Sequence, residues 1–213
     1  MAHDQSILTI PLSEKLKSIP GIFGIRLVEE PLYEVLQTSG EKEIRRYHPF
    51  ITASITVNGS FKEASKEAFF CLANYIFGKN KDKKLLKMTA PVLQEETNDY
   101  IPMTSPVFQG PAHNGWTMSF VLPMEYSLAT APTPKDKRIH LSKTHERLVA
   151  TLQYSGINDQ NKIRKYSAEL IQWLSRNYTY TPLGEIQSAQ YDGPTTIPFF
   201  RKNEIHLEVT KAR

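Results

Sequence analysis

The same order of strand-like and helix-like stretches occurs twice along this 213-residue chain, and this repeat constrains the fold more than any other feature of the sequence. Each half has two β-rich stretches that end at a glycine turn, then a segment of helical periodicity, then two further β-rich stretches. Met88 lies 29 residues after the turn glycine Gly59, and Ile186 lies 30 residues after the turn glycine Gly156. The matched spacing predicts an α+β protein of duplicated β-α-β-β units; the alternative is that two ordinary α+β stretches are alike by chance.

The repeat also predicts how the chain is divided. Residues 31–213 are expected to form a single pseudo-symmetric domain, with pseudo-repeats at about 31–123 and 138–209, and not two independent domains. Residues 1–30 are expected to form an N-terminal arm or a short helix, because Pro20-Gly21 ends a stretch of helical spacing.

Charge and cysteine content narrow the class of function. Lys and Arg number 26 against 22 Asp and Glu, and a net charge of +4 is by itself too small to indicate a nucleic-acid partner. Because Cys71 is the only cysteine, the sequence excludes an intrachain disulfide and a Cys-rich zinc or iron–sulfur site. No apolar run approaches the roughly 18 residues of a membrane span, and the N-terminus lacks a secretory pattern. We therefore expect a cytoplasmic protein with no membrane span and no nucleic-acid partner.

The two expected helices, 61–78 and 159–177, differ in their apolar residues. The second has one apolar stripe, as expected for a helix with one buried face. In the first, a similar stripe that must face the sheet consists of Ala64, Ala68, Leu72 and Tyr75. Four further apolar residues lie around the other side: Phe69, Phe70, Ala73 and Phe77. These extra apolar side chains are expected to be covered by something other than the sheet. The sequence does not decide between another element of this chain, a partner chain and a flat apolar ligand.

Motifs of known catalytic sites are absent from the sequence. It has no Gly-rich phosphate loop, no G-x-S-x-G elbow and no H-E-x-x-H helix. Five lysines occur within residues 79–87, which favours a solvated loop over a site for carboxylates or phosphates. His140 and His145 flank a turn, and two histidines at this spacing are a poor metal candidate. Cys71 is expected to be a small buried apolar residue, and His206 is expected on the outward or groove face of its strand.

Six short motifs, in this order along the chain, resemble those of the SOUL heme-binding protein family. They are Tyr33-Glu34-Val35, Glu43-Ile44-Arg45-Arg46-Tyr47, Asn74-Tyr75-Ile76-Phe77-Gly78-Lys79-Asn80, Met88-Thr89-Ala90-Pro91-Val92, Pro123-Met124-Glu125-Tyr126 and Arg201-Lys202-Asn203-Glu204-Ile205. The resemblance runs from about residue 31 to 209. It implies a distorted antiparallel β-barrel flanked by two helices and built from duplicated β-α-β-β units. The same architecture resembles bacterial effector-binding domains, which clasp flat hydrophobic molecules.

The resemblance implies that heme or another tetrapyrrole binds in a shallow apolar groove on the first helix. Transferred by position, that groove holds Lys66, Phe69, Phe70, Ala73 and Phe77. Some family members have a histidine in the strand before this helix, where this chain has Arg46. His48 lies two residues further on the same strand face and is therefore the candidate axial ligand of the heme iron. The family places basic residues near its C-terminal motif, whereas residues 195–197 of this chain are Thr-Thr-Ile.

The function that the resemblance implies is a cytosolic heme- or tetrapyrrole-binding protein that buffers or carries reversibly bound heme and performs no chemistry itself. A heme-dechelating or heme-degrading enzyme that uses the same groove is one alternative. A protein-interaction module that docks partners on the aromatic helix face is another. All three use the same apolar surface, so the sequence leaves them open, together with the oligomeric state.

Overall fold

The structure is a computed structural model, and it describes residues 29–97, 115–176, 178–193 and 196–212. The expected N-terminal arm, residues 1–30, lies outside this part of the chain except for its last two residues. The helices and strands are β1 (Tyr33–Ser39), β2 (Lys42–Tyr47), β3 (Ile51–Asn58), α2 (Phe61–Ile76), β4 (Val92–Thr97), β5 (Gly115–Val121), β6 (His140–Lys143), β7 (Arg147–Ser155), α3 (Gln160–Arg176), β8 (Tyr180–Gln190), the 3-10 turn η1 (Pro198–Phe200) and β9 (Lys202–Lys211).

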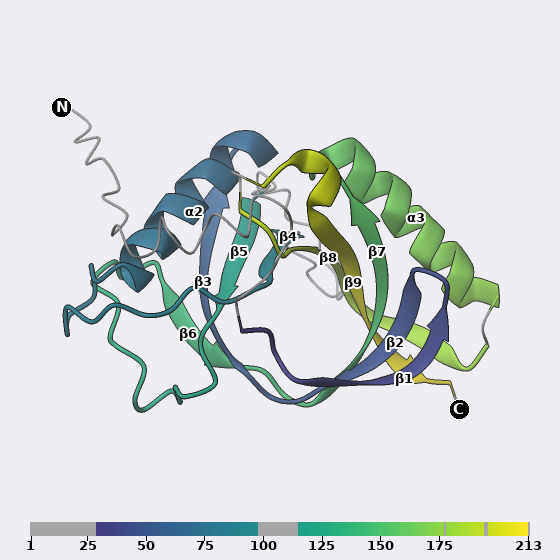
Figure 1. Ribbon diagram of the computed structural model, residues 1–213, viewed down its shortest axis with the longest axis horizontal. Helices are drawn as coiled ribbons and strands as arrows, with labels where there is room; N and C mark the ends of the chain where they lie inside the picture. Colours follow the sequence, from purple (N-terminus) through teal and green to yellow (C-terminus); the bar gives the residue numbers. More distant parts are fainter. Residues whose placement is uncertain (1–28, 98–114, 177, 194–195, 213) are drawn as a thin grey trace, which may run out of the picture.

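All nine strands belong to one strongly curved antiparallel sheet, and the two helices cover its outer side (Figure 1). The strand order is β1-β2-β7-β9-β8-β4-β5-β3-β6. Helix α2 packs on β3 and β5, and helix α3 packs on β7, β8 and β9. The expected α+β class and the two flanking helices are confirmed. The barrel does not close, because β1 and β6 are the two edges of an open sheet.

The strand order is symmetric about the central pair β8 and β4, as the duplicated sequence pattern predicts. On one side β8, β9, β7 and β2 follow one another, and on the other side β4, β5, β3 and β6 do so. Strand β2 precedes β3 in the chain but pairs with β7, and β6 precedes β7 but pairs with β3. Each half therefore completes the sheet of the other.

Each helix covers its own apolar cluster on this shared sheet. Leu72 of α2 and Leu170 of α3 are both fully buried, at the centres of the two clusters. Ala64, Ala68 and Tyr75 are buried with Leu72, so the expected core stripe of the first helix is confirmed. The turn glycines that precede the helices also correspond, because Gly59 (φ +123°) and Gly156 (φ +106°) both adopt positive φ, where a Cβ is strained.

Several strands differ from the sequence expectation. The strand expected from Ile186 already begins at Tyr180. The strand expected from Met88 begins only at Val92, since residues before it form a bridge to Glu29 and a hydrogen bond from the Ala90 amide to the Glu29 carbonyl. Strand β1 was not expected as an element. It pairs with β2 through a register shift between Val35 and Gln37, which interrupts the regular alternation of side chains.

Helix α2 begins at Ser60, whose side chain caps it. The Ser60 hydroxyl accepts a hydrogen bond from the Glu63 amide and donates one to the Glu63 carboxylate, 2.7 Å away. Replacing Ser60 by alanine removes this cap and should lower the free energy of unfolding by about 1 kcal/mol. For a chain of this size the melting temperature should fall by about 2–4 °C. A thermal melt of Ser60→Ala beside the parent protein measures it, and an unchanged melting temperature would show that the cap contributes nothing.

Candidate functional site

The residues expected in the groove lie on α2 or at its C-cap, Phe77, and are buried to different degrees. Lys66 is exposed, and Phe70 is 43% exposed. Phe69 and Phe77 are half-buried and pack against the core beneath α2, and Ala73 is fully buried. Of the four surplus apolar residues, Phe70 therefore offers the most ring surface to a ligand, whereas Ala73 offers none.

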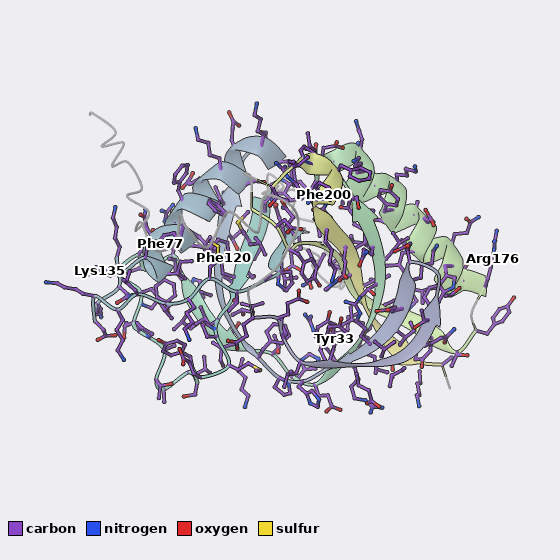
Figure 2. The ribbon with its side chains drawn as sticks, viewed as in Figure 1. Tyr33, Phe77, Phe120, Lys135, Arg176 and Phe200 are labelled. Carbon is purple, nitrogen blue, oxygen red and sulfur yellow. The ribbon has the colours of Figure 1, made fainter. Side chains whose placement is uncertain are left out.

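Three aromatic rings pack in series between the core and the exposed side of Phe70. Phe120 of β5 lies beneath the helix (Figure 2), and its ring centroid is 5.6 Å from that of Phe69. The Phe69 centroid is 6.5 Å from that of Phe70, and both ring pairs meet edge to face. Phe70 is thus the outer end of a packed aromatic series, held by rings behind it, and is well suited to contact a flat apolar molecule.

The lysine-rich loop after α2 is held in place by a buried asparagine. The Asn80 side-chain amide donates to the carbonyl oxygens of Tyr75 and Lys84, at 3.0 and 2.7 Å, and its oxygen accepts from the Lys84 amide. The five lysines of the loop are exposed while Asn80 is fully buried. The loop therefore carries several positive charges on a fixed backbone at the C-terminal end of α2.

His48 lies apart from the α2 residues. It follows β2, which is separated from β3 and β5 in the sheet order, and its amide donates to the Leu32 carbonyl, 3.0 Å away. The connection from β2 to β3 runs along the lower edge of the sheet, whereas α2 covers the upper part (Figure 1). The expected axial ligand, His48, therefore does not lie at the expected groove. The sequence indicated which face of its strand His48 shares, but it could not indicate which helix lies near that face.

A pocket of about 320 Å³ lies on the other flank of α2, lined by Cys71, Asn74, Tyr75, Lys79, Lys135, Asp136 and Ile139. Two of the lining residues contact Arg138, which forms ion pairs with Glu67 and Asp136, at 2.7 and 2.8 Å, and donates to the Cys71 sulfur at 3.2 Å. Burial raises the pKa of the Cys71 thiol, and the charge of Arg138 opposes it only in part. Cys71 therefore stays a thiol at neutral pH and is not an activated nucleophile.

The inner face of the sheet contains a buried ionic cluster that the sequence expectations did not include. Arg45 of β2 binds Glu204 of β9 with two hydrogen bonds, Nη1 to Oε2 at 2.9 Å and Nη2 to Oε1 at 3.1 Å. The Tyr191 hydroxyl donates to Glu204 Oε2 at 2.7 Å, and Lys202 Nζ lies 3.2 Å from Oε1. His206 Nε2 is also 2.7 Å from Oε2, and because a carboxylate can only accept, Nε2 carries the hydrogen.

His206 was expected to face solvent or a groove, and this was wrong. It does lie opposite the apolar residues of β9, but the curved sheet covers it and leaves it 3% exposed. Burial lowers the pKa of His206, as do the charges of Arg45 and Arg147, against the effect of Glu204. Burial raises the pKa of Glu204, but the hydrogen bonds that it accepts from His206 and Arg45, together with the charge of Arg45, outweigh burial and hold this pKa well below the ordinary value. At neutral pH the cluster thus contains a carboxylate and a neutral imidazole.

This cluster predicts that acid destabilises the fold in two steps. Below about pH 6.5 the unfolded chain protonates His206 while the folded protein does not, so the free energy of unfolding falls by up to about 1.4 kcal/mol per pH unit. Glu204 adds a second loss as the pH falls below about 4.5. Denaturant unfolding at a series of pH values should show His206→Gln with a flatter profile between pH 6.5 and 5 than the parent protein. Identical slopes would contradict the role given to His206.

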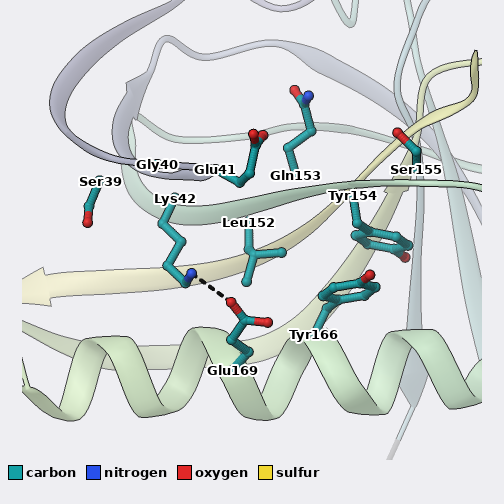
Figure 3. Close-up of a pocket in the computed structure, with 10 residues that line it drawn as sticks. All are labelled: Ser39, Gly40, Glu41, Lys42, Leu152, Gln153, Tyr154, Ser155, Tyr166 and Glu169. Atoms are coloured by element: carbon teal, nitrogen blue, oxygen red, sulfur yellow. Dashed lines mark hydrogen bonds and ion pairs between the residues drawn. The ribbon is translucent and has the colours of Figure 1, made fainter.

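A second pocket, of about 390 Å³, lies between the β1–β2 turn, the end of β7 and α3 (Figure 3). Lys42 Nζ and Glu169 Oε1 form an ion pair across it at 2.7 Å. The rings of Tyr154 and Tyr166 stack with centroids 4.3 Å apart, and the Tyr154 hydroxyl bonds to the Asn158 side chain. The charged and aromatic side chains that line this pocket therefore contact one another, and these contacts hold α3 against the sheet.

Within the described ranges, no helix combines the length and apolar character needed to cross a membrane. In the same ranges, no three or more His, Cys, Asp or Glu side chains are grouped so that they could hold a metal ion.

Comparison with known proteins identifies the family. The family model described as SOUL heme-binding protein matches residues 28–208. The chain belongs to this family. Heme-binding protein 1 of Xenopus tropicalis is 28% identical over 181 residues, covering 80% of this chain and 87% of that protein. Heme-binding protein 2 of Homo sapiens is 25% identical over 204 residues, covering 92% of this chain and 95% of that protein. The SOUL resemblance carried by the six motifs is thereby confirmed.

Solved structures with little sequence similarity share the SOUL fold seen here. The EcmrR C-terminal domain matches with a TM-score of 0.58 at 14% identity, over 85% of this chain and 99% of that one. A Listeria innocua structure described as a hydrolase matches with a TM-score of 0.53 at 10% identity, over 82% of this chain and 94% of that one. At this identity the likeness concerns the fold alone, and the effector-binding-like architecture is confirmed at that level.

Proposed function

We propose that this SOUL family protein binds heme or a related tetrapyrrole on the outer face of α2, with Phe70 as the main contact. The observation that carries the proposal is the half-exposed Phe70 ring at the outer end of the Phe120–Phe69–Phe70 series. Membership of the family and the names of its two heme-binding relatives support the same ligand class.

The residues present suit the two parts of such a ligand. A tetrapyrrole has two flat apolar faces, and Phe70 offers an aromatic surface that a face can cover. Its propionates are anionic, and Lys66, one helical turn before Phe70, is exposed on the same side of α2. The exposed lysines of the loop after α2 add positive charge near the other end of the helix. When bound, heme supplies an iron centre, and these side chains contribute packing and charge to holding it.

The proposed site is better suited to a protein that carries or buffers heme than to one that holds heme as a tightly bound cofactor. None of the five groove residues is a histidine, and His48 lies apart from them. A ligand held by one exposed face and by surface charges, without a ligand bond from these residues, leaves readily because little of its surface is buried. We therefore assign reversible binding to this face, with the porphyrin ring and not the iron as the recognised part.

The experiment is a titration of the apo-protein with hemin and, separately, with metal-free protoporphyrin. Both should saturate near one equivalent, with dissociation constants within about tenfold of each other, because the ring is recognised in each case. His48→Ala should leave the hemin absorption spectrum unchanged. Loss of a low-spin spectrum in His48→Ala, or failure of metal-free protoporphyrin to bind, would show that ligation to iron holds the group and that the assignment to α2 is wrong.

A further inference from the structure

An apolar tip projects from the β8–β9 connection, away from the residues used above. Ile197, Phe199 and Phe200 are 42%, 77% and 42% exposed, and Ile157, which follows β7, is 55% exposed. Most large apolar side chains of the described chain are buried beneath the helices, so four exposed ones on neighbouring turns form a patch that requires an explanation. We define these four residues as the apolar tip.

The fold brings the two segments of the tip together and fixes their backbone. Ser155 of β7 pairs with Lys202 of β9, and the Asn203 side chain donates to the Gly156 carbonyl at 2.9 Å. The Phe200 amide bonds to the Ile197 carbonyl and the Arg201 amide to that of Pro198, which closes the turn η1. Figure 1 shows η1 beside the first turns of α3, and Figure 2 places Phe200 at this end of the molecule. The backbone of the tip is therefore held by hydrogen bonds at the end of the molecule where α3 begins.

Basic residues flank the apolar tip. The first two turns of α3 contain Lys162, Arg164 and Lys165, and Arg201 follows Phe200 directly. Against these four basic residues stand two acidic ones, Asp159, which accepts from the Lys162 amide, and Asp192, which accepts from the Lys202 amide. The charge around the tip is thus mainly positive, and Arg164 and Lys165 are exposed.

We propose that the apolar tip inserts into the surface of an anionic phospholipid bilayer. Exposed aromatic and aliphatic side chains beside basic residues match the acyl boundary and the negative headgroups of such a surface. A few inserted side chains and a few surface charges give weak, reversible attachment. The tip and the α2 face are built from different segments, so this attachment does not depend on tetrapyrrole binding.

Vesicle co-sedimentation of the apo-protein tests the proposal. At low ionic strength, vesicles with about 30% phosphatidylserine should retain the protein at least roughly tenfold better than pure phosphatidylcholine vesicles, and added salt should release it. Phe199→Ser should weaken retention at least roughly fivefold. Lys165→Glu should weaken it on anionic vesicles only. The matched control is Tyr178→Ser, because Tyr178 is an aromatic residue 88% exposed after the opposite end of α3, and this change should have no effect.

Three results would overturn the proposal. They are equal retention on neutral and anionic vesicles, equal retention of the parent protein and Phe199→Ser, and absence of retention on any vesicle. If retention is absent and Phe199→Ser instead changes the sedimentation coefficient of the free protein, the tip is a contact between copies of the chain. Because Phe199 is so exposed, Phe199→Ser should melt within a few degrees of the parent protein, and a melt of each variant verifies that retention reports on the surface and not on unfolding.

Discussion

Replacing Glu204 by leucine should lower the free energy of unfolding by about 3–5 kcal/mol, because it leaves the Arg45 guanidinium buried without its carboxylate. Arg45 is 4% exposed and Glu204 is fully buried, so water cannot replace the lost partner without opening the sheet. Glu43, the other carboxylate on Arg45, contacts Nε at 2.6 Å, so it is Nη1 and Nη2 that lose their carboxylate when Glu204 is replaced. For a chain of this length the melting temperature should fall by about 6–20 °C.

The double variant Arg45→Met with Glu204→Leu separates the unpaired charge from loss of packing. It removes both charges and keeps similar volumes, and it should therefore be more stable than Glu204→Leu alone. Denaturant unfolding of both variants and the parent measures the difference. If the double variant is no more stable than Glu204→Leu alone, the lost stability does not come from the guanidinium without its carboxylate. It then comes from packing, or from the lost hydrogen bonds of Tyr191 and His206.

Phe70→Asp should weaken hemin binding at least roughly tenfold while leaving the melting temperature within a few degrees of the parent. Full burial of a phenylalanine ring is worth about 1.5–3 kcal/mol, and aspartate both removes that ring and adds a charge that repels the propionates. The ring is already 43% exposed in the free protein, so its loss costs the fold little.

Ile171→Asp is the matched control for Phe70→Asp. Ile171 lies on α3 next to the buried Leu170 and is 46% exposed, so the same charge is placed on the other helix of the pseudo-symmetric pair. Absorption titrations and thermal melts of both variants should show weaker binding only for Phe70→Asp. Equal weakening in both would reveal a general charge effect, and a collapse of the fold in Phe70→Asp would show that the ring belongs to the core.

Much of the fold could be predicted from the sequence because the repeat fixes both spacing and period. The turn glycines Gly59 and Gly156, the helices after them and the buried pair Leu72 and Leu170 all follow from it. Strand β2 belongs to the first half of the chain but pairs with β7 of the second half. This could not be predicted, since pairing between distant strands has no local sequence signal. The open sheet edge and the bulge near Val35 were missed for the same reason.

The candidate site was predicted less completely than the fold. Helical periodicity identified Phe70 as surplus to the core, but it could not show that Ala73 is fully covered. The inner-face cluster was missed because Arg45 and Glu204 lie 159 residues apart and charged residues on strands ordinarily face water. Its one local signal was the alternation of Glu204 and His206 with apolar residues on β9, which indicates the face but not its burial.

The most direct test of the central claim is to map the bound ligand on the protein by NMR, with hemin as a paramagnetic probe. Amide signals of residues 65–77 in α2 should broaden first as hemin is added, whereas those of α3, residues 160–176, should persist at one equivalent. Broadening centred on β9 around His206, on the turn at 198–200 or equally on both helices would contradict the assignment of the tetrapyrrole to the outer face of α2.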